Sequence, residues 1–397
     1  MALLAFALGP LLSPFIPDGI KTIVSRDALS NILQVIASSM LAVTTFSLSI
    51  MVQALSSATT TATPRASKLL TEDRTAQHAL GAFIGAFLFS ITGIIGLKAH
   101  LYREDVIVVL FLFTLVMIAI IIIMLLRWIG QLSKLGRVGE SISLVENALE
   151  ESIDERKESP TLYARLLPED FCDKKSSCHP VPAPSIGYLR YLDLQKLNST
   201  AEELEMELYI QRCPGAFIRR DKPLMFSTKP LTDDQMQTLM KAVVIGDERS
   251  FSQDPRYGFI ILCEIALRAM SPGVNDPGTA IAVLTSYVRS LERWLNNTAS
   301  SGKSSDAADK IKYQRLYIPK IATDDIVQDM FAPLLPFIGE HFNVLMQVNK
   351  SLVAMAHMQQ GMHFNELKKW QDRLFIVAKR DLIDFEYQDF TKMAEKL

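Results

Sequence analysis

The most informative absence in this 397-residue sequence is that of charged side chains between Ala28 and Val52. A stretch of that length without Asp, Glu, Lys or Arg is long enough to cross a bilayer, which requires about 20 mainly apolar residues. The chain is 49% hydrophobic and 21% charged, and its apolar residues are concentrated before residue 130. The sequence therefore predicts a membrane part followed by a soluble part.

Signatures of the common enzyme classes are also lacking. There is no G-x-x-x-x-G-K-[ST], no G-x-G-x-x-G after a strand, no H-E-x-x-H and no G-x-S-x-G. The sequence also shows no nucleophile–base pair that would support an enzyme acting on a lipid. The net charge of −2 disfavours a nucleic-acid partner bound through bulk charge. We expect a protein that is not an enzyme, with no catalytic residue and no cofactor.

Metal-ligating patterns are sparse as well. The six histidines are scattered, and the four cysteines form no C-x-x-C pair. Cys172, Cys178 and His179 offer three potential ligands without an obvious fourth. We therefore predict no metal site, and the cysteine usage suits a reducing compartment.

Hydroxyl and amide side chains recur along one face of the apolar segment from Asp27 to Thr60. As a helix this segment is about 50 Å long, more than the roughly 30 Å hydrocarbon core. At roughly 100° per residue the polar positions fall within about 100° of arc. We call them the polar stripe: Gln34, Ser38, Thr45, Ser49, Gln53, Ser56 and Thr60.

Two interpretations of the polar stripe remain open. Small hydroxyl residues join neighbouring helices by packing and hydrogen bonding in lipid. Alternatively, the stripe lines a water-filled pore at the centre of an oligomer, where Ser and Thr oxygens replace part of an ion's hydration shell. The cores of the second to fourth spans carry no Asp, Glu, Lys or His, so a proton-coupled carrier is disfavoured.

Three further segments complete a predicted membrane domain, residues 1–130, of about four helices. Residues 1–16 predict a kinked or truncated first span, since Pro10 and Pro14 interrupt them. Residues 79–97 form a third span, in which Gly81-x-x-x-Gly85 predicts close helix packing. Residues 106–129 form a fourth, which we expect to face lipid because it lacks polar groups.

The rest of the chain predicts a cytoplasmic α+β domain. Residues 131–157 keep helical apolar spacing and read as a helical extension. Residues 158–230 predict a small, mainly β module, and residues 231–397 a mainly helical domain with an isolated strand at 315–319 and a helix running from 232 to about Val244. A modest excess of Lys and Arg in the loops after the second and fourth spans places this domain in the cytoplasm.

The loop from Ser271 to Thr279 has two prolines, two glycines and an Asn-Asp pair. It is either a rigid connector whose polar side chains bond local backbone, or an anion site at the start of the next helix. The positions concerned are Ser271, Gly273, Asn275, Asp276 and Thr279.

Several motifs resemble one family along nearly the whole chain. They are Thr45-Phe-Ser-Leu-Ser49 with Pro64-Arg65, Asp73-Arg74 with Gly81-x-x-x-x-Phe87, Gln253-Asp254, Ile265-Ala-Leu-Arg-Ala-Met270, and Ser271-Pro-Gly-Val-Asn-Asp-Pro277. The family is that of bacterial predicted integral membrane proteins sharing a domain of unknown function. The resemblance implies a multi-pass protein of the bacterial inner membrane with a cytoplasmic C-terminal domain, and no mechanism.

Two functional hypotheses follow. The first is a homo-oligomeric channel for monovalent inorganic cations, in which residues 27–60 line the pore and the cytoplasmic domain assembles or gates the subunits. The second is a non-conducting membrane sensor or scaffold that binds a ligand or protein partner. It predicts a polar stripe buried between helices of one subunit.

Overall fold

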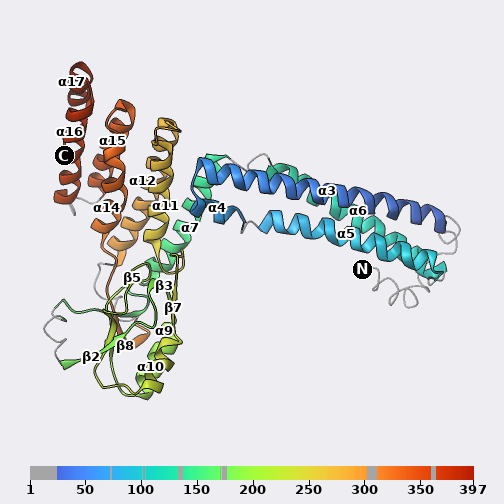
Figure 1. Cartoon of the computed structure of the whole chain (residues 1–397), viewed down its shortest axis with the longest axis horizontal. Coiled ribbons are helices and arrows are strands. Elements are labelled where there is room, and N and C mark those ends of the chain that lie inside the picture. The colour runs from blue at the N-terminus through green and yellow to red at the C-terminus, as the bar shows by residue number, and fades with distance from the viewer. Residues whose placement is uncertain are drawn as a thin grey trace. The chain divides into compact units, whose positions relative to one another are not determined.

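The computed structural model describes residues 25–71, 74–100, 102, 104–132, 137–169, 171, 177–301, 311–358 and 364–397. The chain divides into two units. The N-terminal unit comprises Met1–Thr60 and Ser67–Glu140, and the C-terminal unit comprises Thr61–Ala66 and Ser141–Leu397. Figure 1 labels the helices and strands of both.

Three helices of the N-terminal unit are long and apolar enough to cross a membrane: α3 (Arg26–Thr61), α5 (Arg74–Lys98) and α6 (Glu104–Leu132). Their candidate spans have mean hydropathies of 1.9, 2.1 and 3.5. The short helix α4 (Pro64–Thr71) lies between α3 and α5 in the chain. These spans match the predicted second to fourth. The predicted first span, residues 1–16, lies outside the described residues.

The core of the N-terminal unit is built from one face of each spanning helix. Leu29, Leu33 and Phe83 are fully buried in it. The expectation that the fourth span faces lipid is wrong for its first part, since residues 106–110 of α6 are buried. A helix that is apolar on all sides carries no information about which face is packed, so the sequence could not make this distinction.

Nine α-helices of the C-terminal unit fall within the described ranges. They are α7 (Val138–Glu158), α9 (Leu194–Glu203), α10 (Asp233–Met240), α11 (Pro255–Ala269), α12 (Pro277–Ser301), α14 (Thr323–Leu334), α15 (Phe342–Met358), α16 (Phe364–Asp381) and α17 (Asp384–Met393), with a 3-10 turn at Leu335–Phe337. The fully buried Tyr287 of α12 contacts the rings of Phe259 and Phe331 edge-on. Its hydroxyl donates to the Ile326 carbonyl at 2.6 Å, which fixes α12 against α14.

Two β-sheets complete the C-terminal unit. The five-stranded sheet has the order β1 (Ala164–Leu166), β8 (Tyr313–Ile318), β4 (Leu208–Ile210), β6 (Pro223–Ser227), β2 (His179–Pro182). The three-stranded sheet has the order β5 (Phe217–Ile218), β3 (Gly187–Leu192), β7 (Val243–Gly246).

Two predictions about this region are wrong in detail. The strand expected to be isolated is β8, which pairs in parallel with both β1 and β4. The helix expected to reach Val244 ends at Met240, and Val243–Gly246 forms β7 instead. Both strands lie beyond residue 230 and pair with strands far away in the sequence. Pairing over such separations leaves no local sequence signal, and this explains why both predictions were wrong.

Candidate functional site

The polar stripe lies on the outside of the N-terminal unit. The six stripe residues whose side chains are described are all exposed: Gln34, Ser38, Thr45, Ser49, Gln53 and Ser56. Thr60 belongs to α3, but its side chain is not among those described. The packed face of α3, represented by Leu33, Ile36 and Met40, lies about half a turn away around the helix. No helix of the described N-terminal unit therefore covers the stripe.

Hydrogen bonds within α3 determine what the stripe offers to its surroundings. The Ser38 hydroxyl donates to the Gln34 carbonyl at 3.0 Å. The Thr45 hydroxyl donates to the Leu41 and Ala42 carbonyls at 3.1 and 2.9 Å. A hydroxyl has one hydrogen to donate and two lone pairs to accept with. Since the hydrogen is used within the helix, these two oxygens present acceptor lone pairs outward.

An acidic residue missed as a site residue lies on the same face. Asp27, in the first turn of α3, is exposed and falls within the arc of the polar stripe. Its neighbour Arg26 points elsewhere and donates from Nη2 to the Tyr102 carbonyl at 3.1 Å. The stripe thus has a carboxylate at one end. The helical angle of Asp27 could have been read from the sequence.

Glycines of α5 fall into two groups. A Cβ added at Gly93 would come within 2.9 Å of the Leu33 side chain, so Gly93 allows α3 and α5 to approach closely. A Cβ at Gly81 or Gly85 would meet nothing within 4 Å. The predicted packing role of Gly81 and Gly85 therefore has no partner helix among the described residues, and it remains a prediction.

The loop from Ser271 to Thr279 is held by its own polar groups. The Ser271 hydroxyl donates to the Arg268 carbonyl at 2.7 Å. The Asp276 carboxylate accepts from the Thr279 amide at 3.0 Å and from its hydroxyl at 2.6 Å, and these bonds lower the pKa of Asp276. Asn275 has a φ of 47°, and Gly273 is exposed. A carboxylate at the start of α12 repels anions, so the geometry favours the connector interpretation.

The potential metal ligands Cys172, Cys178 and His179 are only partly described. Cys172 lies outside the described residues, and Cys178 is half-buried with a free thiol. Within the ranges that the structure describes, no group of three His, Cys, Asp or Glu side chains is arranged to hold a metal ion.

A buried polar centre lies in the C-terminal unit. Arg156 is 1% exposed and donates to the carbonyls of Gln253, at 3.0 and 3.2 Å, and Pro160, at 3.0 Å. Burial lowers its pKa. Asp254, also buried, accepts from the Arg249 guanidinium at 2.8 and 2.9 Å, and burial raises its pKa although Arg249 acts in the opposite direction. These bonds anchor the start of α11.

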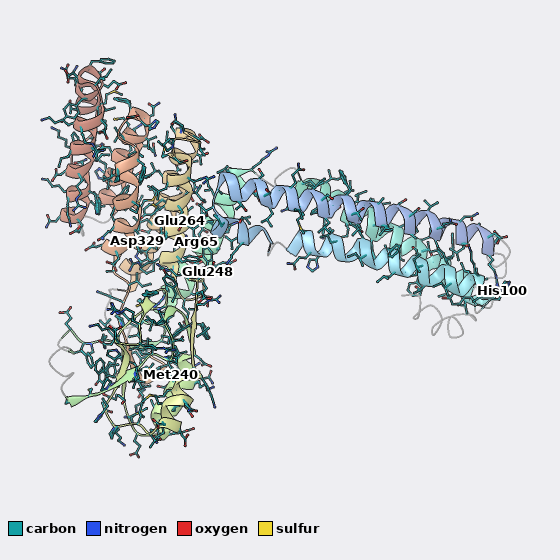
Figure 2. The ribbon with its side chains drawn as sticks, viewed as in Figure 1. Arg65, His100, Met240, Glu248, Glu264 and Asp329 are labelled. Atoms are coloured by element: carbon teal, nitrogen blue, oxygen red, sulfur yellow. The ribbon has the colours of Figure 1, made fainter. Side chains whose placement is uncertain are left out.

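The segment that follows α3 belongs to the C-terminal unit and forms an ion pair there. Arg65 contacts the Glu264 carboxylate of α11, and Figure 2 shows the two side chains next to each other. Burial raises the pKa of Glu264, and the neighbouring Arg65 guanidinium acts to lower it. Arg65 belongs to the motif Pro64-Arg65, and Glu264 directly precedes the motif Ile265–Met270; both motifs carry the family resemblance.

Comparison with known families agrees with this architecture. Residues 1–354 match the family described as "Predicted membrane protein (DUF2254)". The chain belongs to this family. Members of the family are thus described by their membrane character, which fits the three apolar helices of the N-terminal unit.

Similar curated proteins add no activity. Uncharacterized proteins of Mycobacterium tuberculosis and Mycobacterium bovis are each 31% identical to this chain over 138 residues. The match covers 31% of this chain and 26% of each relative, so it spans about a quarter of the relatives' length. No solved structure matches the chain.

Proposed function

We propose that this membrane protein is a homo-oligomeric channel for monovalent cations in the bacterial inner membrane. Copies of α3 surround a central axis and line it with the polar stripe, and the cytoplasmic C-terminal unit assembles or gates the subunits. The observation that carries the proposal is that every described stripe side chain is exposed, on the side of α3 opposite its packed face.

Exposure matters because hydrocarbon cannot hydrate polar groups. The side-chain amides of Gln34 and Gln53 each carry two N–H donors and one carbonyl acceptor. The backbone of their own helix cannot satisfy all of these groups, so they need a polar partner outside it. Polar side chains within a membrane face protein or water. The described helices of the same chain do not cover the stripe, and in the proposed channel its partner is another subunit or water.

Cation preference is supported by the charge that the stripe presents. The back-bonded oxygens of Ser38 and Thr45 are acceptors toward the outside. Asp27 adds a carboxylate at one end of the same face, and an oligomer would place these carboxylates in a ring. Rings of acidic side chains attract cations in channels. The protein acts here as a passive conduit and not as an enzyme.

The second candidate is a non-conducting sensor or scaffold. Its prediction of a stripe buried between helices of one subunit is wrong for the described side chains. A scaffold in which the stripe joins neighbouring subunits is supported by Gly81 and Gly85, which contact no other helix of the described residues. The two candidates differ in whether water occupies the space between the α3 helices.

Ion flux from liposomes tests the proposal. The purified protein should form a symmetric oligomer that passes K⁺ and Na⁺ but not Cl⁻. Thr45→Leu and Ser49→Leu should abolish the flux and preserve the oligomer. Ser39→Leu is the matched control, because Ser39 is exposed but lies about 80° from Ser49 around the helix. A stable oligomer that conducts no ion, or equal flux in all three variants, would refute the pore.

A further inference from the structure

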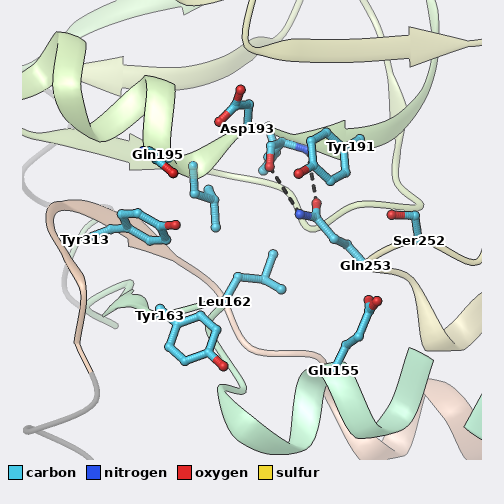
Figure 3. A pocket seen from close by; sticks show the side chains of 11 residues that line it. Glu155, Leu162, Tyr163, Tyr191, Asp193, Gln195, Ser252, Gln253 and Tyr313 are labelled. Atoms are coloured by element: carbon cyan, nitrogen blue, oxygen red, sulfur yellow. Dashed lines mark hydrogen bonds between the residues drawn. The ribbon is translucent and has the colours of Figure 1, made fainter. Parts of the chain in front are cut away.

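A cavity of about 370 Å³ lies within the C-terminal unit. Its walls come from the end of α7, the turn before β1, the junction of β3 with α9, the residues before α11, and the start of β8. Figure 3 shows Glu155, Tyr163, Tyr191, Asp193, Gln253 and Tyr313 around it.

The backbone around the cavity is strained. Leu162, Tyr163 and Gln253 have φ values of 53°, 63° and 59°, in the left-handed region that side chains rarely adopt. All three line the cavity, and they are three of the six such non-glycine residues in the described chain. Strain of about 1–3 kcal/mol per residue concentrates at ligand and active sites. The concentration of left-handed residues around this cavity therefore marks it as a candidate ligand site.

Gln253 forms a fixed wall of the cavity. Its side-chain amide donates to the Leu192 carbonyl at 3.1 Å and accepts from the Leu192 amide at 3.0 Å (Figure 3). Its own carbonyl accepts from the buried Arg156. Because these groups are already paired, Gln253 shapes the cavity, and the recognition of a ligand falls to the other side chains.

The remaining lining combines negative charge with aromatic rings. Glu155 and Asp193 line the cavity, and no Lys or Arg does. Within the described part of the chain, neither carboxylate forms an ion pair, and one Asp193 oxygen caps α9 by accepting from the Lys196 amide at 3.0 Å. Three tyrosine rings, those of Tyr163, Tyr191 and Tyr313, share the walls. Carboxylates and aromatic faces together select organic cations.

Arg156 and Lys312 carry positive charges near the cavity, but both are engaged by other groups of the chain. The guanidinium of Arg156 is buried and directed to the Gln253 and Pro160 carbonyls. The Lys312 ammonium lies 5.3 Å from the centre of the Tyr313 ring. One face of the Tyr313 ring is therefore engaged by this chain's own ammonium group, and the rings of Tyr163 and Tyr191 provide the rest of the aromatic lining.

We infer that this cavity binds a small organic cation bearing an amine or quaternary ammonium group. The inference does not depend on ion conduction, because it concerns the C-terminal unit alone. Choline and putrescine are suitable probes, since they represent a quaternary ammonium and a primary amine.

Isothermal titration calorimetry of the purified full-length protein tests the inference. At least one probe should bind saturably, and the uncharged carbon analogue of choline should not bind. Glu155→Gln and Asp193→Asn should each weaken binding about tenfold, as expected for the loss of one partly shielded charge. Asparagine at position 193 keeps the oxygen that caps α9, so the fold should be preserved. Tyr191→Leu should weaken binding without altering charge.

Glu151→Gln is the matched control, because Glu151 is exposed on the same helix one turn earlier and does not line the cavity. It should bind the probe as the unmodified protein does. The inference is overturned if neither probe binds the unmodified protein. It is equally overturned if the Glu155→Gln/Asp193→Asn double variant binds as tightly as the control.

Discussion

Ser47 and Ser49 lie two residues apart on α3 and face opposite ways. Ser47 is 1% exposed within the N-terminal unit, and its hydroxyl has no hydrogen-bond partner among the described residues. Ser49 is exposed on the polar stripe. Two residues correspond to about 200° around a helix, so one serine packs inside the N-terminal unit and the other faces outward.

This pair separates effects on packing from effects on conduction. Ser47→Ala removes a buried hydroxyl without a partner, so the unfolding temperature should stay the same or rise, and cation flux should be unchanged. Ser49→Leu should leave the unfolding temperature unchanged and abolish flux. Differential scanning fluorimetry and liposome flux measure both properties. Loss of flux in Ser47→Ala with normal flux in Ser49→Leu would reverse the assignment of faces.

Asp27 should set the preference for cations. Replacing it by asparagine removes the carboxylate from the end of the stripe, and Asp27→Glu retains the charge as a control. The reversal potential across a planar bilayer with a KCl gradient should move toward zero in Asp27→Asn and not in Asp27→Glu. An unchanged reversal potential in Asp27→Asn would place selectivity elsewhere on the helix.

The Arg65–Glu264 pair should give a pH-dependent stability. Since the folded-state pKa of Glu264 is raised, ionising this carboxyl costs stability above that pKa, and the cost disappears as pH falls through it. Arg65→Gln removes the opposing charge and enlarges the cost, by about 1 kcal/mol or less because Arg65 is 48% exposed.

The unfolding temperature of Arg65→Gln should therefore fall below that of the unmodified protein at pH values above the folded pKa of Glu264, and approach it as the solution is acidified. The Arg65→Gln/Glu264→Gln double variant should lack this pH dependence. A constant difference between Arg65→Gln and the unmodified protein at every pH would show that Arg65 acts through packing alone.

Arg249 and Asp254 form a buried pair whose loss should be costly. Asp254→Ala leaves the Arg249 guanidinium, 16% exposed, without its carboxylate, which should cost about 3–5 kcal/mol. Asp247→Ala is the control, because Asp247 is exposed and the change should cost less than about 0.5 kcal/mol. Equal unfolding midpoints for the two variants in urea would mean that the pair contributes nothing.

The two groups of glycines on α5 should respond differently to enlargement. Gly93→Leu meets the Leu33 side chain and should destabilise the subunit. A Cβ at Gly85 meets nothing within 4 Å among the described residues, so the Gly85→Leu subunit should stay folded. If Gly85 packs against a neighbouring subunit, its oligomer should dissociate in mass photometry. An intact oligomer would remove this face from the interface.

The sequence was sufficient for features that depend on local periodicity. Three apolar spans and the polar stripe follow from helical spacing. It was insufficient where the partner is distant. Three features depend on contacts between segments far apart in the chain. They are the strands that pair with β8, the carbonyl groups that accept from Arg156, and the difference between the exposed Gly81 and the packed Gly93.

Thiol modification during flux tests the central claim most directly. A Ser49→Cys variant should react with a water-soluble, positively charged thiosulfonate and lose its cation flux, whereas Ser39→Cys and the unsubstituted protein should keep theirs. That result would place Ser49 in a water-filled path that ions use. A Ser49→Cys variant whose thiol does not react, or one that reacts while its flux stays unchanged, would contradict the pore.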